Sequence, residues 1–171
     1  PVIAKGLPAG PGGARGRVVF SSTEAVEWAS KGEKVILVRE ETSPEDVDGM
    51  HKAQAILTTK GGMTSHAALV ARGWGKCCIV GCGDLEIHAD TKTFHAKNNV
   101  IIKEGDWISL NGTKGQVYEG SLSLVAIDID KNPSYKDLMK MVDRVKQIGV
   151  RANAETPEDA LHAVKFGAEG I

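Results

Sequence analysis

A histidine stands between a glycine pair and an apolar helical pattern in residues 60–73, which read KGGMTSHAALVARG. Imidazole can act as a nucleophile or as an acid–base group near neutral pH. His66 follows two hydroxyl residues, Thr64 and Ser65, and either of them can cap the first turn of a helix. The residue types in this stretch therefore suit a reactive histidine at the start of a helix.

The elements around this histidine place it at an anion-binding position. Residues 55–59 favour a β-strand and an apolar helical pattern follows His66, so the order is strand, glycine turn, hydroxyl cap and helix. Gly61 and Gly62 allow the backbone to approach a ligand closely. The amides and dipole at a helix N-terminus favour a phosphate and disfavour imidazolium. We therefore expect a neutral, nucleophilic His66 beside a phosphate-binding loop.

The composition is that of an ordinary globular protein. The chain has 171 residues, of which 42% are hydrophobic and 25% charged, and its net charge is −1. No basic stripe interleaved with aromatic residues occurs, so we expect no nucleic-acid partner. No apolar run approaches the roughly 18 residues of a membrane span, so we expect no membrane association.

Three cysteines, Cys77, Cys78 and Cys82, lie within six positions. An odd number with two adjacent members argues against a disulfide framework and for a reducing, intracellular compartment. Adjacent cysteines on a strand point to opposite faces of the sheet, so they cannot share a metal. We expect no metal site in this chain.

Strand and helix signals alternate in the first half. Residues 35–38 and 77–80 are short apolar runs typical of strands buried on both faces, and residues 43–46 have the form of a capped helix start. The glycine- and proline-rich residues 6–16 are interpreted as a structural turn. A parallel or mixed sheet is expected, with ligand-binding loops gathered at the carboxyl ends of its strands.

The second half changes from short strands to helical patterns. Five short strands are predicted at residues 85–88, 93–95, 100–102, 107–110 and 116–119. Together with the first half they predict an α/β domain of three layers, namely a sheet, a second sheet and helices. An amphipathic helix is then predicted over residues 132–148, and a strand, a capped helix and the start of another strand over residues 150–171. This last segment cannot bury a core by itself, so it resembles the beginning of a (β/α)8 barrel.

The string GGMTSHAA at residues 61–68 resembles the phosphohistidine signature of the phosphoenolpyruvate-utilising enzymes. The family includes the pyruvate phosphate dikinases, the phosphoenolpyruvate synthases and enzyme I of the sugar phosphotransferase system. Met63 and residues 74–83 are most similar to the dikinases, and the likeness extends from residues 6–12 to residues 156–159. The synthases are the alternative within the family, and a non-catalytic adaptor that binds a partner through the helix over residues 132–148 is the alternative outside it.

The resemblance implies a swivelling β/β/α phosphohistidine domain at residues 1–127, a linker helix at 128–148 and a truncated first βα unit of a TIM barrel at 149–171. The dikinases interconvert ATP, phosphate and pyruvate with AMP, pyrophosphate and phosphoenolpyruvate. His66 would be phosphorylated at Nε2, with the Thr64 hydroxyl bonding Nδ1, and plant dikinases resemble this arrangement with a regulatory threonine at the position of Thr64. This fragment alone is expected to be inactive.

The same resemblance implies partners outside these residues. An ATP-grasp nucleotide-binding domain and the C-terminal barrel of the same polypeptide would bind ATP, phosphate, pyruvate and phosphoenolpyruvate. Mg²⁺ would belong to those domains, and the full enzyme would be a homodimer. The expected location is the cytoplasm, or else a plastid or another organelle.

Overall fold

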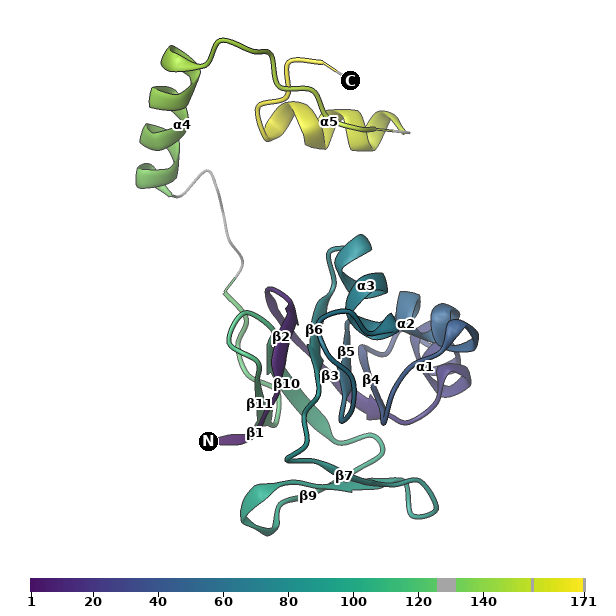
Figure 1. Cartoon of the computed structure of the whole chain (residues 1–171). Helices are drawn as coiled ribbons and strands as arrows, with labels where there is room; N and C mark the ends of the chain where they lie inside the picture. The colour runs from purple at the N-terminus through teal and green to yellow at the C-terminus, as the bar shows by residue number, and fades with distance from the viewer. Residues whose placement is uncertain (126–131, 155, 171) are drawn as a thin grey trace. The chain divides into compact units, whose positions relative to one another are not determined.

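The computed structural model describes residues 1–125, 132–154 and 156–170 (Figure 1). They form two compact units that divide between Leu124 and Val125. The predicted boundary between residues 127 and 128 lies outside the described residues.

The first unit is built on a mixed sheet of eight strands in the order β1-β11-β10-β3-β4-β5-β6-β2. The strands are β1 (Val2–Lys5), β2 (Leu7–Gly10), β3 (Gly13–Val19), β4 (Val35–Arg39), β5 (Ala55–Thr58), β6 (Cys77–Val80), β10 (Trp107–Asn111) and β11 (Gln116–Glu119). The centre, from β3 to β6, is parallel, and the strands outside it pair antiparallel. The predicted mixed sheet is confirmed.

The parallel strands are apolar throughout because both of their faces are covered. Ile36 and Val38 of β4 belong to one buried cluster, whereas Val35 and Leu37 of the same strand belong to a second cluster. Side chains alternate between the faces of a strand, so the two clusters lie on opposite sides of the sheet. This arrangement holds the carboxyl ends of β4 and β5 side by side.

Helices cover one face and a small sheet covers the other (Figure 1). The helices are α1 (Ser22–Ser30), α2 (Val47–Lys52), which follows a 3-10 turn at Pro44–Asp46, and α3 (His66–Gly73). The small antiparallel sheet consists of β7 (Glu86–His88), β8 (Thr93–His95) and β9 (Ile101–Lys103), with a 3-10 turn at Lys97–Asn99 between the last two. All five short strands of the second half are thus observed close to their predicted positions, with β10 and β11 joining the large sheet.

The N-terminal segment differs from the prediction. Residues 7–10 were expected to be part of a turn, but they form β2, an edge strand paired with β6. Pro8 is tolerated at an edge because a strand there needs fewer amide donors. A Cβ on Gly10 would lie 2.1 Å from the carbonyl oxygen of Lys76, so the glycine serves a close strand contact. Glycine and proline were therefore misleading as turn signals here.

The described residues of the second unit contain two helices, α4 (Pro133–Val145) and α5 (Pro157–Lys165). Asn132 caps α4 by accepting from the Tyr135 amide, and Thr156 caps α5 by accepting from the Asp159 amide. The predicted strands at residues 150–154 and 169–171 are represented by one parallel bridge, between Arg151 and Gly170.

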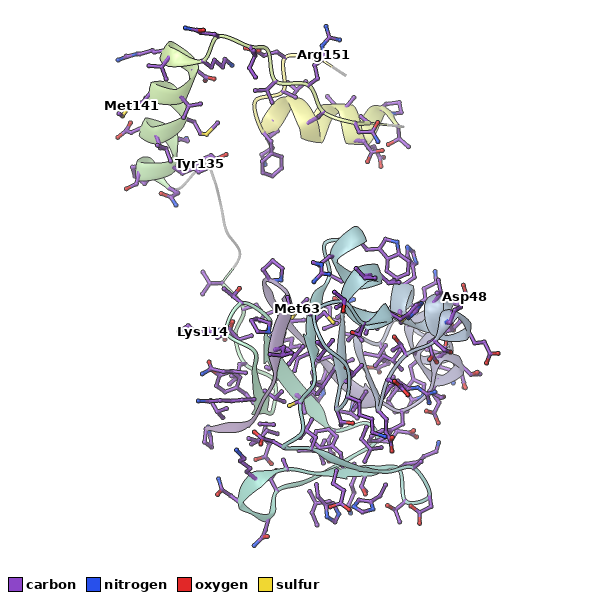
Figure 2. All side chains as sticks on the ribbon, viewed as in Figure 1. Asp48, Met63, Lys114, Tyr135, Met141 and Arg151 are labelled. Carbon is purple, nitrogen blue, oxygen red and sulfur yellow. The ribbon has the colours of Figure 1, made fainter. Side chains whose placement is uncertain are left out.

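No residue of α4 is buried, and four of its apolar side chains are exposed, namely Leu138, Met141, Val142 and Val145 (Met141 is labelled in Figure 2). None of the helices in the described ranges is both long and apolar enough to cross a membrane.

Candidate functional site

His66 is the first residue of α3 and lies just beyond the carboxyl end of β5. Ser65 is the N-cap, and its hydroxyl accepts a hydrogen bond from the Ala68 amide at 3.4 Å. The amides of His66 and Ala67 precede that bond and have no acceptor within the helix. The predicted order of strand, turn, cap and helix is confirmed, with Ser65 rather than Thr64 as the cap.

Gly61 gives the loop its shape. Its φ of +93° is in the region that favours glycine, and a Cβ there would lie 2.9 Å from the Cβ of Ser65. Gly62 has no such requirement, since a Cβ added to it would meet nothing within 4 Å. The two glycines therefore differ: the backbone conformation requires a glycine at position 61, whereas position 62 has open space around it.

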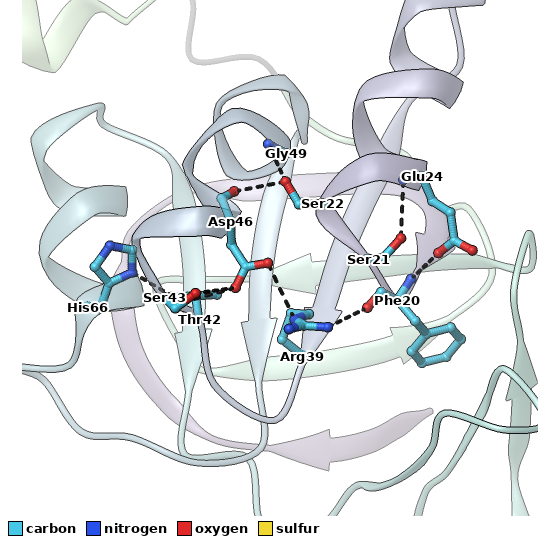
Figure 3. Close-up of polar contacts among 10 residues, drawn as sticks. All are labelled: Phe20, Ser21, Ser22, Glu24, Arg39, Thr42, Ser43, Asp46, Gly49 and His66. Atoms are coloured by element: carbon cyan, nitrogen blue, oxygen red, sulfur yellow. Dashed lines mark hydrogen bonds and ion pairs between the residues drawn. The ribbon is translucent and has the colours of Figure 1, made fainter.

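The Nδ1 atom of His66 is hydrogen-bonded to the hydroxyl of Thr42 at 2.9 Å (Figure 3). The expected partner was Thr64, and that expectation is wrong, because Thr64 is exposed on the loop before the helix. Thr42 follows β4, and β4 is the parallel neighbour of the strand that leads to His66. Two loops at adjacent carboxyl ends thus bring together residues that are 24 positions apart.

A capping box holds the segment that carries Thr42. The Asp46 carboxylate accepts from the backbone amide of Ser43 at 3.0 Å and lies 3.7 Å from Nε of Arg39 (Figure 3). Arg39 also donates to the carbonyl of Phe20 at 3.2 Å. Asp46 is buried, so water cannot easily replace it in these contacts. These contacts stabilise the turn from which the Thr42 hydroxyl contacts the imidazole.

His66 lines a pocket of about 180 Å³. Its walls are formed by residues from the β4 and β5 loops and the start of α3, namely Glu41, Thr42, Thr58, Lys60, Ser65, His66 and Ala67. The hydrogen bond to Thr42 occupies Nδ1, so Nε2 is the ring nitrogen left for covalent chemistry.

Charged residues stand at the edge of this pocket. Lys60 Nζ lies 2.5 Å from a carboxylate oxygen of Glu40, and both side chains are more than half exposed. Their hydrogen bond and opposite charges raise the pKa of Lys60 and lower the pKa of Glu40. Both groups are therefore charged at neutral pH. Neither Thr42 nor Lys60 was assigned a role from the sequence, although the gathering of loops at the strand ends was the available signal.

Two sequence neighbours of His66 are not among the residues that line the pocket. Met63 and Thr64 are both exposed, and the carbonyl of Met63 accepts a hydrogen bond from the Arg72 guanidinium at 2.6 Å. Arg72 thus ties the far end of α3 to the loop that precedes it. This contact stabilises the position of the loop.

The cysteines are buried thiols that lie outside the pocket. Burial raises the pKa of Cys77 to about 11 and the pKa values of Cys78 and Cys82 to about 12. Cys77 and Cys78 belong to different core clusters, as expected for neighbours on a strand. Within the residues that the structure describes, no group of three or more His, Cys, Asp or Glu side chains is arranged to hold a metal ion.

Residues 31–115 match the family model described as PEP-utilising enzyme, mobile domain. The chain is 52% identical over 170 residues to pyruvate, phosphate dikinase 1, chloroplastic, of Arabidopsis thaliana, covering 99% of this chain and 17% of that relative. It is 51% identical over 170 residues to pyruvate, phosphate dikinase of Clostridium symbiosum, covering 99% and 19%. The chain thus spans about a fifth of the length of the curated relatives it matches.

An NMR structure of an Enzyme I protein aligns with 65% of this chain and 38% of its own at 22% identity, but the TM-score of 0.37 is too low for a comparison of folds. The similarity to the dikinases, by contrast, extends over nearly every residue. The chain therefore belongs to the phosphoenolpyruvate-utilising enzymes, and it contains their mobile domain.

Proposed function

We propose that this chain is the phosphoryl-carrier part of a pyruvate, phosphate dikinase and that His66 carries the group. The observation that supports this role most directly is the hydrogen bond between Thr42 and Nδ1 of His66, which leaves Nε2 as the ring nitrogen available for covalent chemistry. The family match and the identity to the dikinases support the same reading.

In the proposed step the Nε2 lone pair attacks the phosphorus of a nucleoside triphosphate or an enol phosphate. An N–P bond forms, and the P–O bond to the donor breaks, with its electron pair leaving on the donor oxygen. In the tautomer with the proton on Nδ1, the ring donates a hydrogen bond across this contact to the Thr42 hydroxyl, which stabilises the positive charge that develops on the ring. Return of the phosphoryl group to an acceptor reverses these changes.

The remaining parts of the enzyme belong to the same proposal, and the partial coverage of the relatives supports the presence of further domains. Residues 1–127 would form a swivelling β/β/α domain, 128–148 a linker helix and 149–171 the first unit of a TIM barrel. An ATP-grasp domain and the rest of the barrel would be the partners, in a homodimeric enzyme. The exposed apolar face of α4 supports docking of that helix on such a partner.

Mg²⁺ belongs to those partner domains in this proposal. A hard cation prefers several oxygen ligands, and the described part of the chain offers no cluster of candidate ligands. The residues beside His66 suit an anion instead, because Lys60 and the first amides of α3 are positively polarised.

The test uses the Clostridium symbiosum dikinase with its aligned 170 residues replaced by this chain. We expect this chimera to form an acid-labile, base-stable phosphate on His66 and to exchange label between pyruvate and phosphoenolpyruvate. The His66→Asn chimera should lose both half-reactions while keeping its circular dichroism spectrum. The isolated chain should consume no ATP. Exchange that persists in the asparagine variant would refute the carrier role and favour a non-catalytic adaptor.

A further inference from the structure

Lys60 is held at the rim of the His66 pocket by its backbone. Its amide donates to the carbonyl of Glu40 at 2.8 Å, and its own carbonyl accepts from the Thr58 hydroxyl at 2.7 Å and from the Gly81 amide at 3.2 Å. The bond to Glu40 continues the pairing of β4 and β5 beyond the strand ends, and the bond from Gly81 continues the pairing of β5 and β6. The origin of the lysine side chain is therefore fixed, although its ammonium group is exposed.

The side chain of Lys60 has one partner in the structure and a second candidate beside it. It pairs with Glu40 at 2.5 Å, with 63% and 57% of the two side chains exposed. Lys60 and His66 also line the same pocket. An ion pair exposed to this degree contributes little to stability, because water and salt screen it. The ammonium can therefore leave Glu40 at small cost.

The pocket needs a cation once a phosphoryl group arrives. Glu41 lines the same pocket, and Glu40 stands beside it, so two carboxylates would repel a phosphoryl group on Nε2. Among the pocket residues in the described structure, Lys60 is the one with a permanent positive charge. A doubly charged phosphoryl group attracts an ammonium more strongly than a single carboxylate does.

We propose that Lys60 is a phosphoryl-binding residue that exchanges Glu40 for the phosphate on His66. The inference rests on the carrier function proposed above and adds a residue to it. In the free state Glu40 holds the ammonium at the rim of the pocket. As the N–P bond forms, Lys60 donates a charge-assisted hydrogen bond to a phosphoryl oxygen and Glu40 returns to water. The Lys60 ammonium thus compensates the negative charge of the phosphoryl group only while His66 carries that group.

The full 171-residue chain can test this without its partners if a small donor is used. Phosphoramidate transfers its phosphoryl group to an imidazole nitrogen: a new N–P bond to the imidazole forms, the P–N bond of the donor breaks, and its amino group leaves as ammonia. We would follow His66 phosphorylation by intact mass and the phosphoryl resonance by phosphorus NMR. The variants are Lys60→Gln, Lys60→Arg and Glu40→Gln. Lys31→Gln is the matched control, because Lys31 forms a similarly exposed pair with Glu27 at 2.6 Å.

We expect Lys60→Gln to slow phosphorylation of His66 by about tenfold, less than the loss of an enclosed oxyanion donor causes. It should also hasten hydrolysis of the N–P bond and raise the pKa of the phosphoryl group. Lys60→Arg should keep all three properties close to those of the wild type, Glu40→Gln should accelerate phosphorylation, and Lys31→Gln should change nothing. A merely structural lysine would not alter the pKa of the phosphate.

Two outcomes would overturn the proposal. Equal rates and equal phosphoryl pKa values in the wild type, Lys60→Gln and Glu40→Gln would remove the role of Lys60 while leaving His66 as the carrier. Phosphoramidate labelling that avoids His66 in the wild-type chain would remove the carrier function and the role of Lys60 together.

Discussion

Replacement of Thr42 by valine removes the hydrogen bond to His66 while nearly preserving the shape of the side chain. Thr42 is 8% exposed, so water cannot readily take the place of its hydroxyl. A hydrogen bond between neutral groups contributes about 1 kcal/mol, and one to a charged group about 1.5–3 kcal/mol. Only the difference between the two states accelerates the transfer, because the same bond already exists before the reaction.

That difference, about 0.5–2 kcal/mol, corresponds to a rate about 2- to 30-fold lower in Thr42→Val. The assay is single-turnover phosphorylation of His66 in the chimeric dikinase, with nitrogen NMR of the imidazole to identify the protonated ring nitrogen. We expect Thr42→Val to lose the preference for protonated Nδ1 and Thr42→Ser to keep it.

Thr64→Val is the matched control, since Thr64 is exposed and Thr42 is the threonine bonded to the ring. It should retain both the rate and the tautomer. A slow Thr64→Val variant beside a Thr42→Val variant of normal rate would show that the bond in Figure 3 is not the one used during transfer. Equal, normal rates in both variants would show that neither hydroxyl assists the histidine.

Three further predictions concern other parts of the unit. Thr64→Glu should slow phosphorylation of His66 about tenfold relative to Thr64→Gln. Like charges about 6 Å apart repel by roughly 3 kcal/mol at an effective dielectric of about 20, and solvent screening reduces this repulsion. Equal rates in the two variants would contradict the prediction. Asp46→Asn should lower the free energy of unfolding in urea by about 1–3 kcal/mol, since the buried carboxylate is bonded to Ser43; an unchanged midpoint would show that the capping box is dispensable. The three buried thiols should resist iodoacetamide at pH 8.5 in the folded chain and react in urea, because burial raises their pKa values above the usual 9.0; they are Cys77, Cys78 and Cys82. Since the unfolded chain ionises them first, stability should also fall as pH rises above about 9.

Local order in the site could be predicted because its signals lie close together in the chain. A β-forming run, a glycine with positive φ, a serine cap and an apolar helix follow one another between residues 55 and 73, and each depends on neighbours within a few positions. The central strands were predictable for a similar reason. Strands buried on both faces consist of continuous apolar residues, and β4 and β6 are such runs.

Contacts between distant elements were decided by the tertiary structure. The identity of the threonine on His66 depends on the pairing of β4 with β5, which brings Thr42 to the imidazole and leaves Thr64 in solvent. The same pairing sets Lys60 beside Glu40. The edge strand β2 was missed because its partner, β6, lies about 70 residues away, and the proline and glycine within it favour a turn when only neighbours are considered. The identity of the reactive side chain and the start of its helix were thus determined by local sequence. The residues that contact this side chain depended on strand register, which no short stretch of sequence specifies.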